Sequence, residues 1–168
     1  MPIISTDIVY RLSGGASNTD VNASLGGAKS STSVATGLHN LFDVVGSAEA
    51  AAGDTEYRCV YVHNNHGTLT MQSAKIWISS NTPSTDTSVE IALGSSAVNG
   101  TEQTVANEST SPTGVTFSAP ANEGASLSIG DIPAGQHKAV WIKRIINTGA
   151  AAYNNDTATL TVKCDTAA

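Results

Sequence analysis

Apolar and polar residues alternate in several short runs, which is the pattern of β-strands with one buried face. The clearest run covers residues 138–146 and is rich in β-branched and aromatic side chains. It follows a turn that contains Asp131, Pro133 and Gly135, three residue types that favour turns for separate backbone reasons. This stretch therefore predicts a turn followed by a central strand.

Similar patterns predict about seven or eight strands in all, with turn residues between them. The other predicted strands are residues 7–12, 57–63, 69–79 with a break near Ser73, 88–93, 115–117, 127–129 and 157–164. Helical propensity is confined to residues 48–52, which end at Gly53. We predict an all-β fold, an antiparallel β-sandwich of immunoglobulin-like or jelly-roll type, and periodicity does not choose between these two.

Residues 1–50 differ from the rest of the chain. Residues 13–36 consist mainly of Ser, Gly, Ala, Asn and Thr, and a short apolar cluster follows at residues 38–45. Such a segment buries too little apolar surface to order by itself, so it is either flexible or lies on another surface. We predict an extended N-terminal arm at residues 1–50, with a short apolar and helical segment, and a β-sandwich domain at residues 51–168.

Composition limits the possible partners. Charged residues make up only 13% of the 168 residues, and the net charge of −6 comes from 8 basic and 14 acidic side chains. A chain with few, scattered cations is unsuited to the phosphate backbone of nucleic acids, so no nucleic-acid partner is expected. No apolar run is long enough to cross a membrane, and the first residues lack a secretory signal pattern. We therefore expect synthesis in the cytosol and no membrane partner.

Candidate chemistry is sparse. His63 and His66 have a spacing that two metal ligands could use, with Asp54 and Glu56 upstream, but a polar hairpin explains them better. The isolated His39 and His137 lack the sequence context of a nucleophile and its base. Oxygen ligands at 54–56 or 154–156 do not form a calcium-loop pattern. The predicted site therefore contains no catalytic, cofactor-binding or metal-binding residue, and we expect a protein that is not an enzyme and needs no cofactor.

Two tryptophans and two cysteines lie within predicted strands. If Val140 and Ile142 face the core, Trp141 faces the opposite side of its sheet, where it would be a candidate interface residue. Trp77 has a matching context, and exposure of either ring would favour stacking on a sugar. Cys59 and Cys164 are far apart in the chain, and we expect two reduced, buried thiols rather than a disulfide.

Several phrases resemble small structural proteins of tailed bacteriophages and prophages. These phrases are residues 40–43 with 49–62 (Asn-Leu-Phe-Asp and Glu-Ala-Ala-Ala-Gly-Asp-Thr-Glu-Tyr-Arg-Cys-Val-Tyr-Val), the opening residues 3–15, and residues 132–144 around Ile-Pro-Ala-Gly-Gln and Val-Trp-Ile-Lys-Arg. The resemblance covers most of the chain and carries structural motifs only. It implies a virion component assembled in the host cytoplasm, such as a capsid decoration (cement) protein, with neck or tail proteins as relatives.

The expected function is thus to bind and stabilise a phage head shell through the major capsid protein or other virion proteins, as a homotrimer. The alternative is a carbohydrate-binding or host-adhesion module of a tail or head fibre, which would need an exposed Trp77, Trp141 or Tyr153. Burial of both tryptophans would remove most of the support for this alternative.

Overall fold

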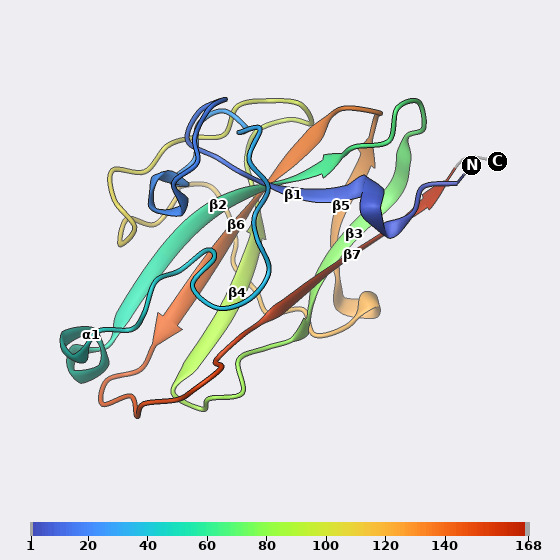
Figure 1. The fold of residues 1–168 in the computed structure, drawn as a ribbon. Coiled ribbons are helices and arrows are strands. Elements are labelled where there is room, and N and C mark those ends of the chain that lie inside the picture. The colour runs from blue at the N-terminus through green and yellow to red at the C-terminus, as the bar shows by residue number, and fades with distance from the viewer. Residues whose placement is uncertain (1, 167–168) are drawn as a thin grey trace.

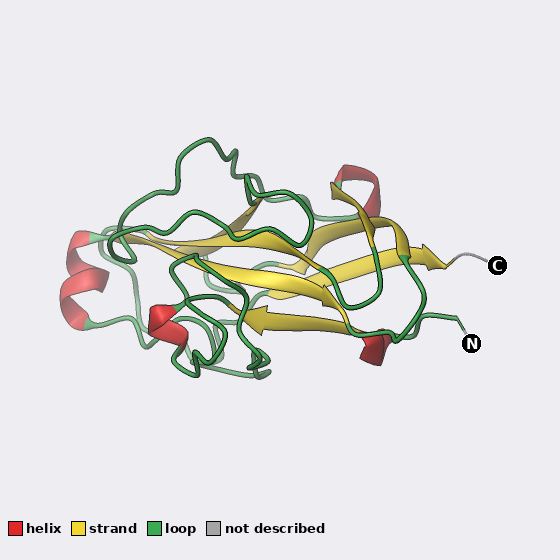
Figure 2. Cartoon of the chain, turned by 90° about the horizontal axis from the view of Figure 1, so that it is seen from above, coloured by secondary structure: helices red, strands yellow, loops and turns green. Residues whose placement is uncertain are grey.

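The chain folds into two antiparallel β-sheets with very little helix, as a computed structural model of the protein shows for residues 2–166 (Figure 1). The elements in chain order are η1 Ser5–Asp7, β1 Ile8–Leu12, η2 Val21–Ala23, α1 Ser47–Ala52, β2 Asp54–Asn64, β3 Met71–Ser80, β4 Thr87–Leu93, η3 Glu123–Ala125, β5 Leu127–Ile132, β6 His137–Ile146 and β7 Thr159–Thr166. The prediction of an all-β fold is confirmed. Short helical turns and long loops connect the strands (Figure 2).

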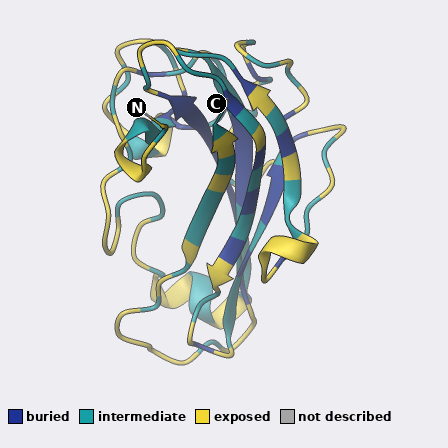
Figure 3. Ribbon diagram, turned by 90° about the vertical axis from the view of Figure 1, so that its right-hand side faces the viewer, coloured by how far each residue is buried: buried dark blue, intermediate teal, exposed yellow. Residues whose placement is uncertain are grey.

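One sheet has four strands in the order β1-β2-β6-β4, and the other has three in the order β5-β3-β7. The long pairing of β2 with β6 runs from Asp54 opposite Ile146 to His63 opposite His137. The inner side chains of both sheets form one hydrophobic cluster that includes Val60, Ile76 and Ile91. Buried positions follow the strands and exposed positions lie mostly on loops (Figure 3). The immunoglobulin-like and jelly-roll alternatives for a sandwich stay predictions.

The irregular points of the three-stranded sheet match two sequence signals. Ser73 has a positive φ of 50°, and the pairing register between β3 and β5 shifts on either side of Ala74. Asp131 stabilises this bulge, because its Oδ1 accepts the Ser73 N–H at 2.8 Å. The predicted break near Ser73 is thus a bulge within the continuous strand β3, and Asp131 binds this bulge in the neighbouring strand rather than capping its own turn.

The predicted short strand at residues 115–117 is wrong. Val115 and Phe117 pack their side chains onto the outer face of the four-stranded sheet, and only Ser118 exchanges backbone hydrogen bonds, with Ile91. In this irregular loop, successive side chains point in turn towards the sheet and towards solvent. The sequence therefore alternates as it would in a strand.

The structure places residues 8–34 within the fold rather than in an extended arm. β1 pairs along its whole length with β2, and the loop behind it returns to donate and accept hydrogen bonds at Leu12. Ser13 Oγ donates to the Cys59 carbonyl at 2.8 Å, and the Cys59 N–H donates to Ser24 O at 2.8 Å. The small polar residues of this segment are thus ordered by their contacts with other parts of the same chain. Whether residues 51–168 fold without them stays a prediction.

Candidate interaction groove

A groove of about 830 Å³ opens at the end of the molecule that carries α1. Its walls are the loop at residues 37–47 and the loop at residues 149–158. Its floor reaches the core at Val89, Ile142 and Leu160, which come from both sheets. The groove is therefore an opening between the two sheets that the loops cover only in part.

The rim of this groove carries exposed apolar side chains. Leu38 is 41% exposed, Val44 64% and Tyr153 54%, and all three line the groove. Among the described residues the only other large apolar side chain so exposed is Ile4, which does not line it. We call Leu38, Val44 and Tyr153 the apolar rim. Exposed apolar side chains gathered around one groove are typical of interaction sites on soluble proteins.

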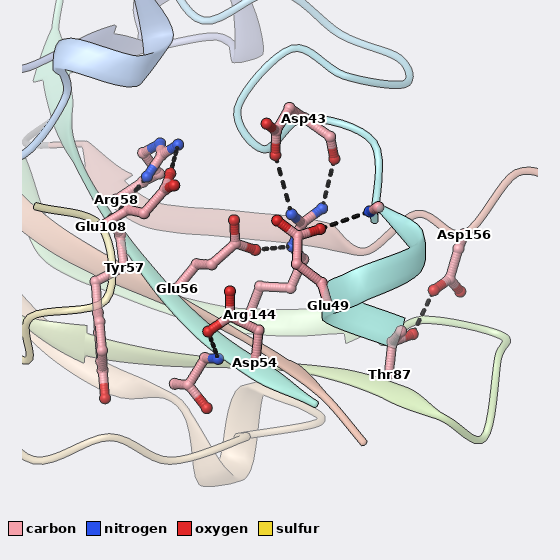
Figure 4. Close-up of polar contacts among 12 residues, drawn as sticks. Asp43, Glu49, Asp54, Glu56, Tyr57, Arg58, Thr87, Glu108, Arg144 and Asp156 are labelled. Atoms are coloured by element: carbon pink, nitrogen blue, oxygen red, sulfur yellow. Dashed lines mark hydrogen bonds and ion pairs between the residues drawn. The ribbon is translucent and has the colours of Figure 1, made fainter. Parts of the chain in front are cut away.

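An arginine at the groove holds the 37–47 loop to the sheet (Figure 4). Arg144 on β6 donates to the backbone carbonyl of Asp43 at 2.6 Å and pairs with its carboxylate at 3.2 Å. It also donates to the carboxylate of Glu56, and its guanidinium lies 4.9 Å from the centre of the Phe42 ring. Three kinds of contact therefore fix this loop and position Leu38 and Val44, the two residues of the apolar rim that it carries.

Glu56, the main partner of Arg144 on β2, is fully buried. Burial raises the pKa of its carboxyl, while the hydrogen bond and charge of Arg144 act in the opposite direction. Its Oε1 is buried without a hydrogen-bond partner. Arg58 on β2, whose side chain is fully buried, pairs with Glu108 in the loop that follows β4. Arg144 and Arg58 thus hold two loops against the sheet, and neither ion pair involves a residue of the apolar rim.

Glu49, Asp54 and Glu56 form the one group of metal-ligand side chains in the described part of the chain, with one oxygen of each within 4.8 Å of the others. The protein already uses an oxygen of each carboxylate. Glu49 accepts the Gly46 N–H at 2.5 Å, Asp54 accepts the Thr55 N–H at 2.7 Å, and Glu56 binds Arg144. The group thus caps α1 and anchors Arg144, and it is not by itself a metal site.

The imidazoles of the two histidines with metal-ligand spacing contact different backbone groups. Nδ1 of His66 accepts the N–H groups of Thr68 and Leu69 at 3.1 and 3.0 Å. Nδ1 of His63 lies 3.1 Å from the carbonyl of Gln136. His66 therefore shapes a turn, as a polar hairpin predicts, while His63 belongs to the outer face of the four-stranded sheet.

The tryptophans differ in exposure. Trp141 points away from the main core, as the alternation predicts, but it is 0% exposed within a second apolar cluster with Tyr57, Tyr61 and Ala92. The expectation that it is a candidate interface residue is wrong, because loops cover this face of the sheet. Trp77 is half-buried opposite Thr161.

The two cysteines and the remaining histidines lie in different elements of the fold. Cys59 and Cys164 are both free thiols, the first buried and the second half-buried. Burial raises the pKa of each thiol, so both stay protonated at neutral pH. His39 lies in the groove wall with a positive φ of 58°, and His137 lies across from His63.

Comparison with protein-family models, curated proteins and solved structures found no match to this chain. No helix in the described residues is both long and apolar enough to cross a membrane.

Sequence reasoning did not find the apolar rim as a site. Residues 38–45 stood out as an apolar cluster, but nothing local distinguishes residues that pack inward, such as Leu41 and Phe42, from the exposed Leu38 and Val44. Tyr153 comes from a loop over a hundred residues later. Only the fold brings these segments together.

Proposed function

We propose that this chain is a non-enzymatic structural protein of a bacteriophage particle, a capsid decoration (cement) protein that binds and stabilises the head shell. The observation that carries the proposal is the apolar rim around an open groove, in which Arg144 holds the loop that carries Leu38 and Val44. A rim of this kind gains binding free energy by burying apolar area, with no turnover. The resemblance of the chain to phage structural proteins supplies the class of partner, the major capsid protein or another virion protein.

The low charge of the chain supports the same role. Charged side chains are only 13% of the sequence, so a large contact would desolvate few ions. Repeated copies on a shell make such contacts many times over. A homotrimer that presents three copies of the groove would add avidity, because each further contact is then intramolecular.

The test is binding to shells that lack the protein. Purified chain is mixed with expanded capsids of the phage or prophage that encodes it, and co-sedimentation gives the number of copies bound. We expect saturation at hundreds of copies per shell and a loss of at least tenfold in affinity for Val44→Asp. Ile4→Asp is the matched control, because Ile4 is equally apolar and exposed but does not line the groove.

Equal binding of Val44→Asp and wild type would exclude the apolar rim as the contact. Failure of the wild type itself to bind would exclude the decoration role. Because Val44 is 64% exposed, the melting temperature of the variant should match that of the wild type.

A carbohydrate-binding module is the second candidate, and one observation favours it. Tyr153 is 54% exposed, and the exposed Asn154 lines the same groove. An exposed aromatic ring can stack on a sugar, and a neighbouring amide can form hydrogen bonds with its hydroxyls. The burial of Trp141 removes one of the two tryptophans from this interpretation. Glycan binding that disappears in Tyr153→Ala while capsid binding is absent would favour this candidate.

A further inference from the structure

Basic side chains gather without acidic partners on the outer face of the four-stranded sheet, at the end opposite α1. We call this group the basic cluster. Its members come from β1, β2, β6 and the loop that follows β1: Arg11, Lys29, His63 and His137.

The pairing register brings three of the four side chains together. His63 and His137 are directly opposite each other in the β2–β6 pair. Arg11 pairs with Tyr61, two residues before His63, so its side chain lies on the same face and diagonally adjacent. Opposite and diagonal neighbours in a sheet have Cβ atoms about 5 and 7 Å apart, within reach of one ligand.

The loop behind β1 adds the fourth group. The Ser30 N–H donates to the Leu12 carbonyl at 2.8 Å, which holds Lys29 beside the edge of β1. A terminal nitrogen of Arg11 donates to Ser31 O at 2.5 Å and to Ser33 Oγ at 2.9 Å. The same loop therefore supplies the lysine and orients the arginine, so the two permanent charges are held in place.

These charges are uncompensated in the described structure. Four of the other cations, Arg58, Lys143, Arg144 and Lys163, form ion pairs, while Arg11 and Lys29 form none. Burial, together with the charges of Lys29 and Arg11, lowers the pKa of His63 to about 4. Burial lowers the pKa of Lys29, and Arg11 adds to the effect. The whole chain has a net charge of −6, yet these cations lie together without acidic partners and repel one another. Such an arrangement destabilises the fold and therefore indicates a functional site.

One buried polar atom of the basic cluster also lacks a partner. Arg11 Nε is buried and forms no hydrogen bond within the protein. Glu102 lies in a loop that covers this face, but its carboxylate accepts hydrogen bonds from Ser95 and Ser96 and forms none with the basic cluster. A buried donor without an acceptor costs free energy, which an anionic ligand would recover.

We propose that the basic cluster binds a small tetrahedral oxyanion of the phosphate or sulfate class. Two permanent cations flanked by two imidazoles suit a compact anion with two negative charges better than a single carboxylate. The donors approach from the sheet and from a separate loop, which matches a ligand with acceptors on several sides. This inference does not depend on the proposed capsid role.

The test uses the full chain and inorganic phosphate, with sodium chloride at the same ionic strength as reference. We expect phosphate to raise the melting temperature saturably and to shift the imidazole NMR signals of His63 and His137. The signals of His39 and His66 serve as internal controls, because neither side chain belongs to the basic cluster. Lys29→Gln should weaken phosphate binding at least fivefold, and Lys75→Gln, on the other sheet and also without an ion pair, should leave it unchanged.

Equal effects of chloride and phosphate, or shifts of all four histidines together, would overturn the proposal. Equal weakening by both lysine variants would do so too, since it would show general charge screening. Sulfate and glycerol phosphate identify the source of the ligand. Binding of all three anions supports a site open enough for a phosphate ester, and binding of the inorganic ions alone supports a site for a free ion.

Discussion

The outer faces of the two sheets are built differently, although each carries a tryptophan in a similar sequence context. Residues 13–34 and 94–118 cover the outer face of the four-stranded sheet, and Trp141 lies beneath them, fully buried. Trp77 on the three-stranded sheet is only half-buried by the residues that the structure describes. The same aromatic residue is therefore core in one sheet and surface in the other, and the difference comes from loops far from either tryptophan.

The edges of the sheets show the same asymmetry. Residues 30–34 form hydrogen bonds with the backbone of β1. At the other edge, Ser118 forms hydrogen bonds with the backbone of β4, and the side-chain amide of Asn81 binds both the N–H and the carbonyl of Val89 at 2.9 Å. Beyond its pairing with β3, β7 forms no backbone–backbone hydrogen bond with another described segment. The four-stranded sheet is closed on its outer face and at both edges, which protects it from pairing with other chains.

The largest effect should come from removing the cover supplied by the N-terminal segment. Deletion of residues 1–36 takes away β1 and the backbone partners of Cys59, and it exposes Tyr61, whose hydroxyl donates to Gly27 O at 2.6 Å. We expect the truncated chain to lose its cooperative unfolding transition. Circular dichroism during thermal unfolding measures this, with the full chain as reference.

A truncated protein that melts cooperatively near the wild-type temperature would contradict that expectation. It would show instead that residues 51–168, with the short segment before them, fold by themselves, as the sequence composition predicted.

A pair of substitutions tests the two tryptophans directly. Trp141→Ala leaves a cavity in the second apolar cluster and should lower the free energy of unfolding by about 3–5 kcal/mol. Trp77→Ala removes a half-exposed side chain and should cost roughly 1 kcal/mol. Urea denaturation of both variants measures the difference. Similar losses for the two would mean that the covering loops do not hold Trp141 in a packed core.

The strands were the part of the fold that could be predicted from sequence, because alternation reports which side of a strand is apolar. The positions of β2, β3, β4, β6 and β7 followed from it closely. The cover over Trp141 could not be predicted in the same way, because small residues that pack backbone against backbone leave no hydrophobic signal. At Gly26, for example, a Cβ would lie 1.8 Å from the carbonyl oxygen of Gln103, so only glycine fits. The apolar rim was equally hidden, since its members come from two separate loops.

A smaller effect should reveal how the second covering loop is held. Glu102 is 3% exposed, and its carboxylate accepts the N–H groups of Ser95 and Ser96 at 3.2 and 2.9 Å. Burial raises the pKa of this carboxyl, but the hydrogen bonds from Ser96 and Ser95 outweigh it and lower the pKa to about 2. The ionised side chain therefore holds the 94–105 loop over Trp141.

The pKa of Glu102 is lower in the folded chain than in the unfolded chain, so folding favours the ionised form. Its contribution is complete above the unfolded pKa of about 4.5 and is lost as the pH falls towards 2. Glu102→Gln should lower the free energy of unfolding by on the order of 1–2 kcal/mol at pH 7, and the difference from wild type should shrink below pH 4. Denaturant titrations at pH 7, 4 and 3 measure this. A difference that stays constant with pH would mean that the loss comes from packing rather than from the charge of Glu102.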